Sequence, residues 1–305
     1  MSGASVGTEP LTPPGGLAWG RTFVMCPPQH FGVLYEINPW MHREVQVDPD
    51  VAYEQWETLV TTLRSAGAEV LIMDPHPEVP DLVFTANAGV VNGGQFVPSH
   101  FRHPERQGET EIDAAWFADR GWKVDRLPVA LDHEGAGDAL PFTPEGGRTV
   151  LLSGYSFRSD APAATALSTL LGCPVRPIQL VDPRLYHLDI TFCPLDGRRA
   201  IIAPLGWDAY GRRVVEALVP EPLVLTDEET LSFCANSVVV GRTVVMPTVP
   251  PRVGRQLEAW GFTVAQSRVD EFLKAGGGCR CMTLAIDTVL APSAPPTPTD
   301  APATG

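Results

Sequence analysis

Cys281 is the residue of this chain with the clearest capacity for covalent chemistry. It follows the glycine run Gly276-Gly277-Gly278 and precedes Met-Thr. Glycines allow close approach of a ligand to the backbone, so a thiol beside them could act as a nucleophile. Taken alone, the segment fits a buried structural cysteine equally well, and Cys279 is a second candidate. A Cys-x-Cys pair could also bind zinc, but no second Cys/His pair has suitable spacing, so we expect no metal site.

His187 and Asp189 stand two residues apart and could supply acid–base chemistry. If this segment is a strand, both side chains point to the same face. By itself such a pair is more often a satisfied polar pair than a catalytic one. A thiol and an imidazole that come from distant parts of the sequence are, however, the usual nucleophile and acid–base pair of thiol enzymes.

Glu134 and Asp138 flank the glycine-containing segment Gly135-Ala136-Gly137. Carboxylates in such a place can orient a histidine or hold a cation through charge-assisted hydrogen bonds. A polar turn without function is the simpler interpretation of this segment alone.

A fivefold repeat would position these groups. Turn–strand pieces recur roughly every 50 residues, which indicates a repeat architecture. After each second strand comes a segment with reactive or polar residues, and five equivalent loops on a closed ring would point to one centre. The pieces are Gly67–Val70, Gly121–Val124, Gly172–Val175, a degenerate Val219–Pro222 and Gly261–Val264, and the polar residues are Asp81 and Asn87, Glu134 and Asp138, His187 and Asp189, Asn236, and Cys281. The arrangement predicts a thiol enzyme with an acidic pocket.

The hydrophobic pattern predicts alternating strands and helices, and hence the α/β class. Helices are expected at Val51–Ser65, Thr110–Asp119, Ala161–Leu171, Tyr210–Leu218 and Pro251–Trp260. Strands are expected at Thr22–Met25, Val70–Met73, Gly89–Val91, Lys123–Leu127, Thr149–Leu152, Ala200–Ala203, Ser237–Val240 and Thr243–Met246.

Composition sets limits on partners and location. The 305 residues are 44% apolar and carry a net charge of −14, which disfavours nucleic acid and anionic membranes and suits a small cationic substrate. No apolar run is long enough to span a membrane, and no secretory signal pattern is evident. We therefore expect a cytoplasmic protein in which the six cysteines are reduced. We expect one catalytic domain over 20–290, with disordered segments at 1–19 and 291–305.

Several motifs together resemble the guanidine-modifying superfamily of arginine deiminases, dimethylargininases and amidinotransferases. They occur in that family's order over about residues 20–290, and most resemble a bacterial dimethylargininase subgroup and arginine dihydrolases. The motifs are Met25–Pro28, Ile37–Met41, Pro80–Gly89, Glu134–Asp138, Gly154–Arg158, His187–Asp189, Ala235-Asn236 and the glycine-rich Cys281 segment. The resemblance implies a five-bladed α/β propeller of ββαβ-type modules with the active site in a central channel.

The resemblance also implies roles for individual residues. Cys281 would be the nucleophile, His187 the acid–base group, and Glu134 the residue that orients it. Asp189 would hold the guanidinium, and Arg158 the substrate α-carboxylate. The other implied substrate-binding residues are Asp81 and Phe84 in the first pocket loop, Asn38, Asn87, Asp138 and Asn236, and no cofactor is implied.

The expected activity is hydrolysis of the guanidino C–N bond of arginine or an N-methylated arginine. Attack by Cys281 would give a covalent thiouronium, and water would release citrulline plus an amine or ammonia. Three alternatives remain: an arginine dihydrolase that forms ornithine, ammonia and carbon dioxide, an amidinotransferase, and a non-catalytic propeller binding protein. Related deiminases carry an acidic residue at the position of Asn87, and this difference favours the arginine dihydrolase among these alternatives. A homodimer is the default expectation for the oligomer.

Overall fold

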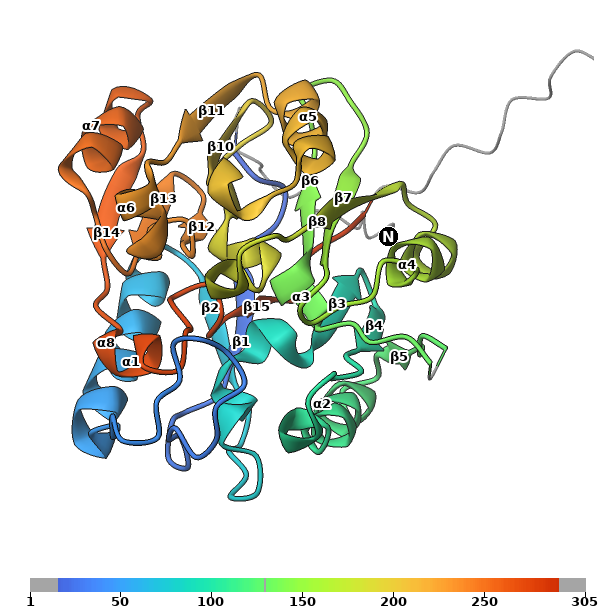
Figure 1. The fold of residues 1–305 in the computed structure, drawn as a ribbon, viewed down its shortest axis with the longest axis vertical. Coiled ribbons are helices and arrows are strands. Elements are labelled where there is room, and N and C mark those ends of the chain that lie inside the picture. The colour runs from blue at the N-terminus through green and yellow to red at the C-terminus, as the bar shows by residue number, and fades with distance from the viewer. Residues whose placement is uncertain (1–15, 129, 291–305) are drawn as a thin grey trace, which may run out of the picture.

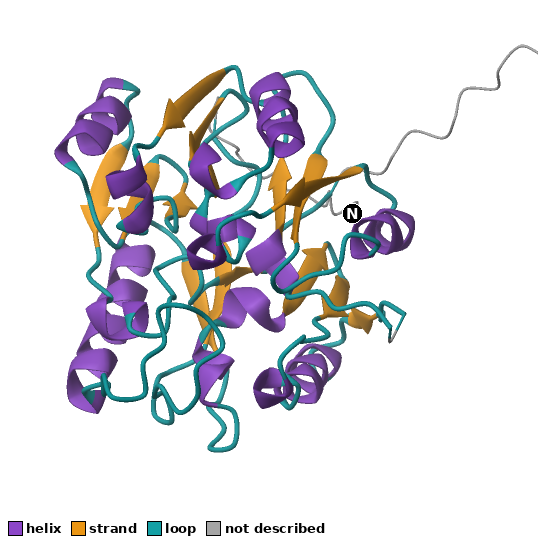
Figure 2. Cartoon of the chain, viewed as in Figure 1, coloured by secondary structure: helices purple, strands orange, loops and turns teal. Residues whose placement is uncertain are grey.

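The computed structural model describes residues 16–128 and 130–290, and their strands form five separate three-stranded sheets. In Figure 1 the colour runs around the molecule from blue through green and yellow to red, so modules that follow in sequence are neighbours in space. Figure 2 shows helices on the outer side of these small sheets. The expected α/β class and the five repeated modules are confirmed.

Four of the modules share one topology. An antiparallel hairpin is followed by a helix and then by a third strand that is parallel to the second strand of the hairpin. They comprise β3 (Gly89–Asn92), β4 (Gln95–Pro98), α2 (Glu109–Ala118) and β5 (Lys123–Val124); β6 (Ala139–Phe142), β7 (Val150–Tyr155), α4 (Ala163–Leu171) and β8 (Val175–Gln179); β9 (Phe192–Pro194), β10 (Arg199–Ile202), α5 (Ala209–Leu218) and β11 (Glu221–Val224); β12 (Val238–Val240), β13 (Thr243–Met246), α7 (Pro251–Ala259) and β14 (Thr263–Gln266).

The remaining module joins two distant parts of the chain. Strand β1 (Thr22–Met25) pairs in parallel with β2 (Glu69–Ile72), and α1 (Pro49–Ser65) connects them. The antiparallel third strand is β15 (Leu284–Ala285). Asp287 strengthens this junction, because its carboxylate accepts hydrogen bonds from the backbone N–H groups of Gly20 and Arg21 at 3.0 and 2.8 Å.

Local sequence explains the helices well. Asp48 caps α1 by accepting from the N–H groups of Asp50 and Val51, which satisfies donors that would otherwise lack partners. The apolar stripe expected on this helix, from Ala52 to Leu63, is buried against the core. Three further short helices follow polar turns: α3 (Gly135–Asp138), α6 (Asp227–Leu231) and α8 (Asp270–Leu273).

Two local predictions were wrong. His187 and Asp189 do not lie on a strand, because Leu188–Ile190 forms a 3₁₀ helix with His187 as its N-cap residue. The shared-face argument therefore does not hold. Strands β4, β6 and β9 were also missed, since each is short and none shows clear alternation.

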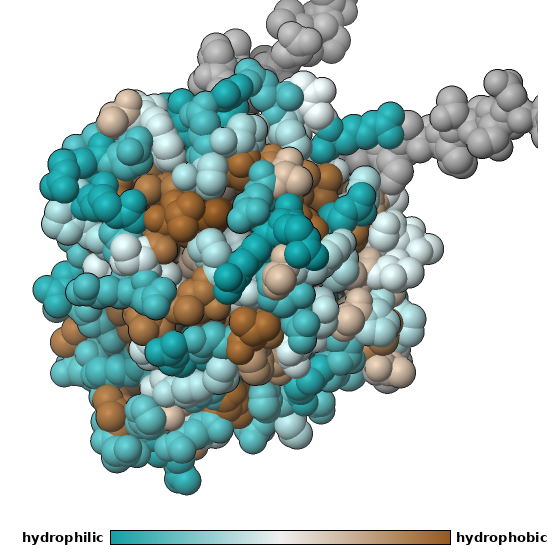
Figure 3. Space-filling view, turned by 45° about the horizontal axis from the view of Figure 1, so that its top comes forward, coloured by the Kyte–Doolittle hydropathy of each residue, from teal (hydrophilic) through white to brown (hydrophobic). Residues whose placement is uncertain are grey.

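The predicted terminal segments fall mostly outside the described residues, including all of 291–305. In the described part of 1–19, Leu17 and Trp19 are buried in the core cluster that also contains Phe23. None of the described helices is long and apolar enough to cross a membrane. On the face drawn in Figure 3, apolar side chains form separate patches among hydrophilic ones.

Candidate active site

A small cavity with a volume of about 250 Å³ collects residues from loops far apart in the sequence. The 3₁₀ turns after β2 contribute to its wall, and so do the loop before α1, the loop after β7 and the glycine-rich segment before β15. The lining residues are Asn38, Met41, Asp81, Phe84, Asn87, Arg106, Arg158, Tyr186, Ala275, Gly277 and Cys281. Six of the predicted site residues therefore meet at one cavity.

Cys281 is buried and lines this cavity. Asn236 donates a hydrogen bond from Nδ2 to Cys281 Sγ at 3.1 Å, and Sγ lies 3.4 Å from Asp189 Oδ2. Asn236 Oδ1 accepts from the N–H groups of Arg280 and Cys281 at 3.0 and 3.2 Å. Burial and the neighbouring Asp189 raise the pKa of the Cys281 thiol well above its ordinary value, so the free protein holds a neutral thiol.

The glycines before Cys281 are required by close packing. A Cβ atom on Gly277 would overlap the Phe84 ring. Phe84 itself packs edge-on against Phe31, with ring centroids 5.5 Å apart. Phe84 therefore packs closely against the glycine-rich segment beside the cavity, and its role in substrate binding stays a prediction.

Cys279 does not reach the cavity. Its thiol donates to the carbonyl oxygen of Ser267 at 3.4 Å, and the residue is fully buried. All six cysteines are free and buried. No group of three or more His, Cys, Asp or Glu side chains in the described part of the chain is placed to hold a metal ion.

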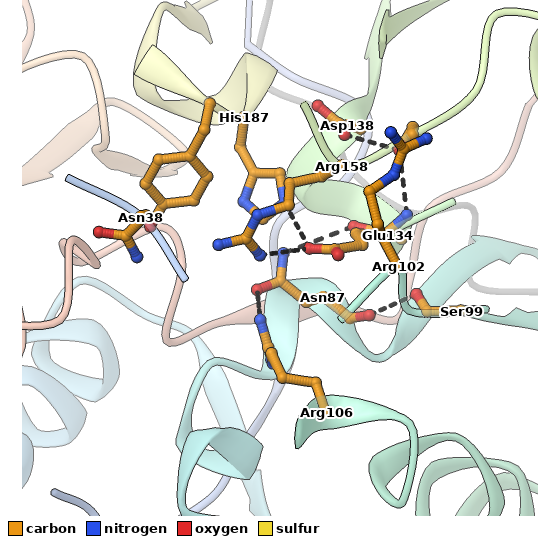
Figure 4. A network of polar contacts seen from close by, with 12 residues as sticks. Asn38, Asn87, Ser99, Arg102, Arg106, Glu134, Asp138, Arg158 and His187 are labelled. Carbon is orange, nitrogen blue, oxygen red and sulfur yellow. Dashed lines mark hydrogen bonds and ion pairs between the residues drawn. The ribbon is translucent and has the colours of Figure 1, made fainter. Parts of the chain in front are cut away.

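His187 and Arg158 converge on one oxygen of Glu134 (Figure 4). His187 Nε2 and Arg158 Nη1 each lie 2.8 Å from Glu134 Oε2. Arg158 also donates from Nη2 to the carbonyl oxygen of Ile37 at 3.1 Å, and its guanidinium lies over the ring of Tyr186. Two of its nitrogens thus hold protein groups, and its role as the ligand of a substrate carboxylate stays a prediction.

The charges of this triad follow from burial and pairing. Burial raises the pKa of Glu134, but Arg158 and His187 outweigh it and hold that pKa well below its usual range. Burial lowers the pKa of His187 to about 4, although Glu134 acts in the opposite direction. At neutral pH the pair is therefore an ionised carboxylate that accepts a hydrogen bond from a neutral imidazole.

Asn87 is oriented by an arginine that the sequence analysis missed. Arg106 donates from Nη1 to Asn87 Oδ1 at 2.9 Å, and Asn87 Nδ2 lies 3.4 Å from the carbonyl oxygen of Glu134 (Figure 4). Glu109 holds Arg106 through two hydrogen bonds of 2.7 Å. The only sequence signal was the Arg-x-x-Glu spacing, which is also common on exposed helices.

The other predicted site residues differ in how they meet the cavity. Asn38 lines it and donates from Nδ2 to the carbonyl oxygen of Ala275 at 3.0 Å. Asp81 lines it as well, and burial raises the pKa of its carboxyl. Asp138 does not line the cavity. Its two carboxylate oxygens accept from the Ser159 hydroxyl and from the N–H of Leu188.

Three buried carboxylate oxygens of the predicted site residues have no hydrogen-bond partner among the described residues. They are Asp81 Oδ1, Glu134 Oε1 and Asp189 Oδ1. Buried polar atoms are nearly always hydrogen-bonded in folded proteins. Burial raises the pKa of Asp81 and raises that of Asp189 to about 7. A cationic ligand with several N–H donors would satisfy these acceptors and favour their ionised forms.

A larger hollow lies elsewhere, between residues 16–19 and the hairpin turns 143–147 and 196–199. Its lining contains neither cysteine nor histidine. The candidate catalytic thiol therefore lies at the smaller cavity.

Comparison with known proteins shows the family of this chain. The family model described as N,N dimethylarginine dimethylhydrolase, eukaryotic, matches residues 36–288. The N(G),N(G)-dimethylarginine dimethylaminohydrolase of Mycobacterium tuberculosis is 37% identical over 268 residues, which cover 87% of this chain and 86% of that protein.

A cyanobacterial relative is longer. The bifunctional arginine dihydrolase/ornithine cyclodeaminase ArgZ of Synechocystis sp. is 40% identical over 272 residues, 88% of this chain but 38% of ArgZ. The chain thus spans about two-fifths of the length of that relative. The crystal structure of a mutant N-terminal domain of ArgZ bound to substrate superposes with a TM-score of 0.82 at 39% identity, covering 87% of this chain and 97% of that domain.

Proposed function

This chain belongs to the N,N-dimethylarginine dimethylhydrolase family, and on that basis we propose that it hydrolyses a guanidino C–N bond of arginine or an N-methylated arginine. The observation that carries the proposal is a set of buried carboxylate oxygens without a hydrogen-bond partner among the described residues. Asp81 lines the cavity together with Cys281, Asp189 contacts the Cys281 thiol, and Glu134 contacts Arg158, which also lines the cavity. A guanidinium is a planar cation with several N–H donors, so it satisfies acceptors of this kind.

The bound cation would also activate the nucleophile. A positive charge beside Cys281 and Asp189 favours their ionised forms and lowers both pKa values. The thiolate then attacks the guanidino carbon, and the carbon–nitrogen electron pair leaves with the amine, which takes a proton from the active site. A thiouronium remains on Sγ. Water, deprotonated by His187, adds to the same carbon, and the carbon–sulfur bond breaks to release a ureido product and the thiolate.

We further propose that the five modules close into a five-bladed propeller around this cavity. Two observations support the closure. The strands β1 and β15 complete one sheet from distant parts of the chain, and the cavity is lined by residues from loops as far apart as Asn38 and Cys281.

A second candidate, the arginine dihydrolase, is favoured by the orientation of Asn87. Arg106 donates to Oδ1, and one hydrogen of Nδ2 faces the carbonyl oxygen of Glu134, so the second hydrogen of Nδ2 is available to a ligand. Such a donor can hold a ureido carbonyl, whereas a carboxylate cannot. A retained ureido intermediate could then undergo a second hydrolysis to ornithine, ammonia and carbon dioxide.

Incubation of the purified protein with arginine and with asymmetric dimethylarginine, followed by mass analysis of the products, tests these functions. Citrulline or ornithine with release of ammonia or dimethylamine supports hydrolysis. A product that forms only when an acceptor amine is added would indicate amidino transfer instead. No turnover of either compound would contradict the proposed function.

Asn87→Asp is expected to shift the product from ornithine toward citrulline while the first step persists, because a carboxylate no longer donates to the ureido oxygen. The ratio of ornithine to citrulline, measured by mass spectrometry against the rate of arginine loss, checks this. If the wild-type protein yields only citrulline, the dihydrolase candidate is wrong.

Alkylation of Cys281 by iodoacetamide is expected to be slow at pH 7 and to increase with pH, with a midpoint above the ordinary cysteine value of about 8.5. Thiolate is the reacting form, and burial and Asp189 raise the pKa of this thiol, so little thiolate exists at neutral pH. Peptide mapping by mass spectrometry separates Cys281 from the other five cysteines. A midpoint at or below the ordinary value would contradict the expectation.

A further inference from the structure

A chain of hydrogen bonds behind the catalytic pair links the backbones of Glu134 and His187. Glu134 N–H donates to Ser159 Oγ at 3.1 Å, and Ser159 Oγ donates to Asp138 Oδ2 at 2.6 Å. The other carboxylate oxygen, Asp138 Oδ1, accepts from the N–H of Leu188 at 3.0 Å. Leu188 directly follows His187, so the chain runs from one partner of the pair to the other.

We propose that Ser159 and Asp138 are positioning residues that hold Glu134 and His187 in register, and that Asp138 is not a ligand of the substrate. The proposal rests on the proposed function, in which His187 transfers protons. It differs from the role that the resemblance implied for Asp138, because Asp138 does not line the cavity and both its oxygens are already bonded.

The positioning is needed because the pair joins segments 53 residues apart in sequence. Glu134 precedes β6, whereas His187 follows β8, so no single element fixes the 2.8 Å contact between them. General acid–base catalysis depends on such geometry, and a displacement of about 1 Å can lower a rate about a hundredfold.

Packing leaves this chain little freedom. Ser159 and Asp138 are fully buried. A Cβ atom on Gly154 would overlap Asp138 Oδ1 and lie 3.0 Å from Leu188 Cβ. The absence of a side chain at Gly154 thus lets the Asp138 carboxylate reach the Leu188 backbone directly.

A second set of contacts joins the segments that carry Glu134 and Ser159. Asp160 accepts from the N–H of Asp132 at 3.0 Å, and Arg102 bridges the carboxylates of both residues. In Figure 4 Arg102 lies on the far side of Glu134 from Arg158. Loss of the Ser159 hydroxyl should therefore relax the catalytic pair without releasing the two segments, so we expect this variant to fold.

The test compares Ser159→Ala and Asp138→Asn with wild type. In Asp138→Asn the amide oxygen can still accept from the N–H of Leu188. The NH₂ group would then face Ser159, and because it is a donor, the Ser159 hydroxyl would lose the acceptor for its hydrogen. Each variant is expected to lower kcat by about ten- to a hundredfold while KM for the substrate changes less than about threefold. Ser168→Ala is the matched control, because its hydroxyl donates to the backbone carbonyl of Cys173 in the turn after α4, away from the cavity, and its kcat should stay at the wild-type value.

An increase in KM at unchanged kcat would show that Asp138 binds substrate and would overturn the proposal. Unchanged kcat and KM in Ser159→Ala would overturn it as well. The ¹⁵N resonances of His187, assigned by comparison with His187→Gln, give a readout that needs no turnover. They should shift in both variants and remain in place in Ser168→Ala; unshifted resonances in the two variants would contradict the proposal. Failure of the proposed function would instead be evident from wild type alone, which would turn over no guanidino substrate.

Discussion

Cys281→Ser is expected to lower kcat by at least about a thousandfold, in the range of losses on removing a catalytic nucleophile. The serine hydroxyl fits beside Asn236 and Asp189, so the pocket should persist. The pKa of a serine hydroxyl is much higher than that of a thiol, however, and a bound cation cannot lower it to near neutrality. Release of ammonia or amine from the preferred substrate is the measurement.

Cys279→Ser is the matched control for this variant. Its thiol is as deeply buried as that of Cys281 but bonds only the Ser267 carbonyl oxygen and stays outside the cavity. We expect most of the activity to remain. Full activity in Cys281→Ser, or loss confined to Cys279→Ser, would show that the nucleophile is misassigned.

His187→Gln is expected to lose at least about a hundredfold in kcat, the lower end of general acid–base effects. Glutamine can still donate a hydrogen bond to Glu134, yet it cannot exchange a proton with water or the leaving amine. Both the formation and the breakdown of the thiouronium should slow. Single-turnover measurements with mass detection of the adduct on Cys281 separate the two steps.

A loss of less than tenfold in His187→Gln would mean that another group carries the protons. Glu134→Gln provides the comparison, because it keeps the hydrogen-bonding shape but removes the charge that stabilises a protonated imidazole. It should show a smaller loss than His187→Gln, together with a changed pH profile.

The sequence was informative where local patterns determine structure. The apolar stripe of α1 is such a local feature and has the predicted form. The glycines before Cys281 were noted as well, but Gly277 makes room for the Phe84 ring, which no local pattern indicates. The pairing of Glu134 with His187 followed from the resemblance to a family, because their 53-residue separation leaves no local signal.

Other parts could not be predicted because they depend on tertiary contacts. His187 caps a 3₁₀ helix although the His-x-Asp pattern fits a strand, since the N–H of Leu188 is taken by Asp138 rather than by a neighbouring strand. Arg106 looks like an exposed charge in sequence, yet it is buried against Asn87 and Glu109. Single charged residues carry no pattern that reveals such burial.

The pairing of β1 with β15 has a consequence for biosynthesis. A ribosome releases β1 early, at roughly 5–20 residues per second, but Leu284 must emerge before the sheet that contains β1 is complete. Cys281 lies just before that last strand, so the nascent chain holds no assembled nucleophile until nearly all described residues have left the exit tunnel. Until then β1 exposes an unpaired edge, which is open to chaperones or to premature association with another chain.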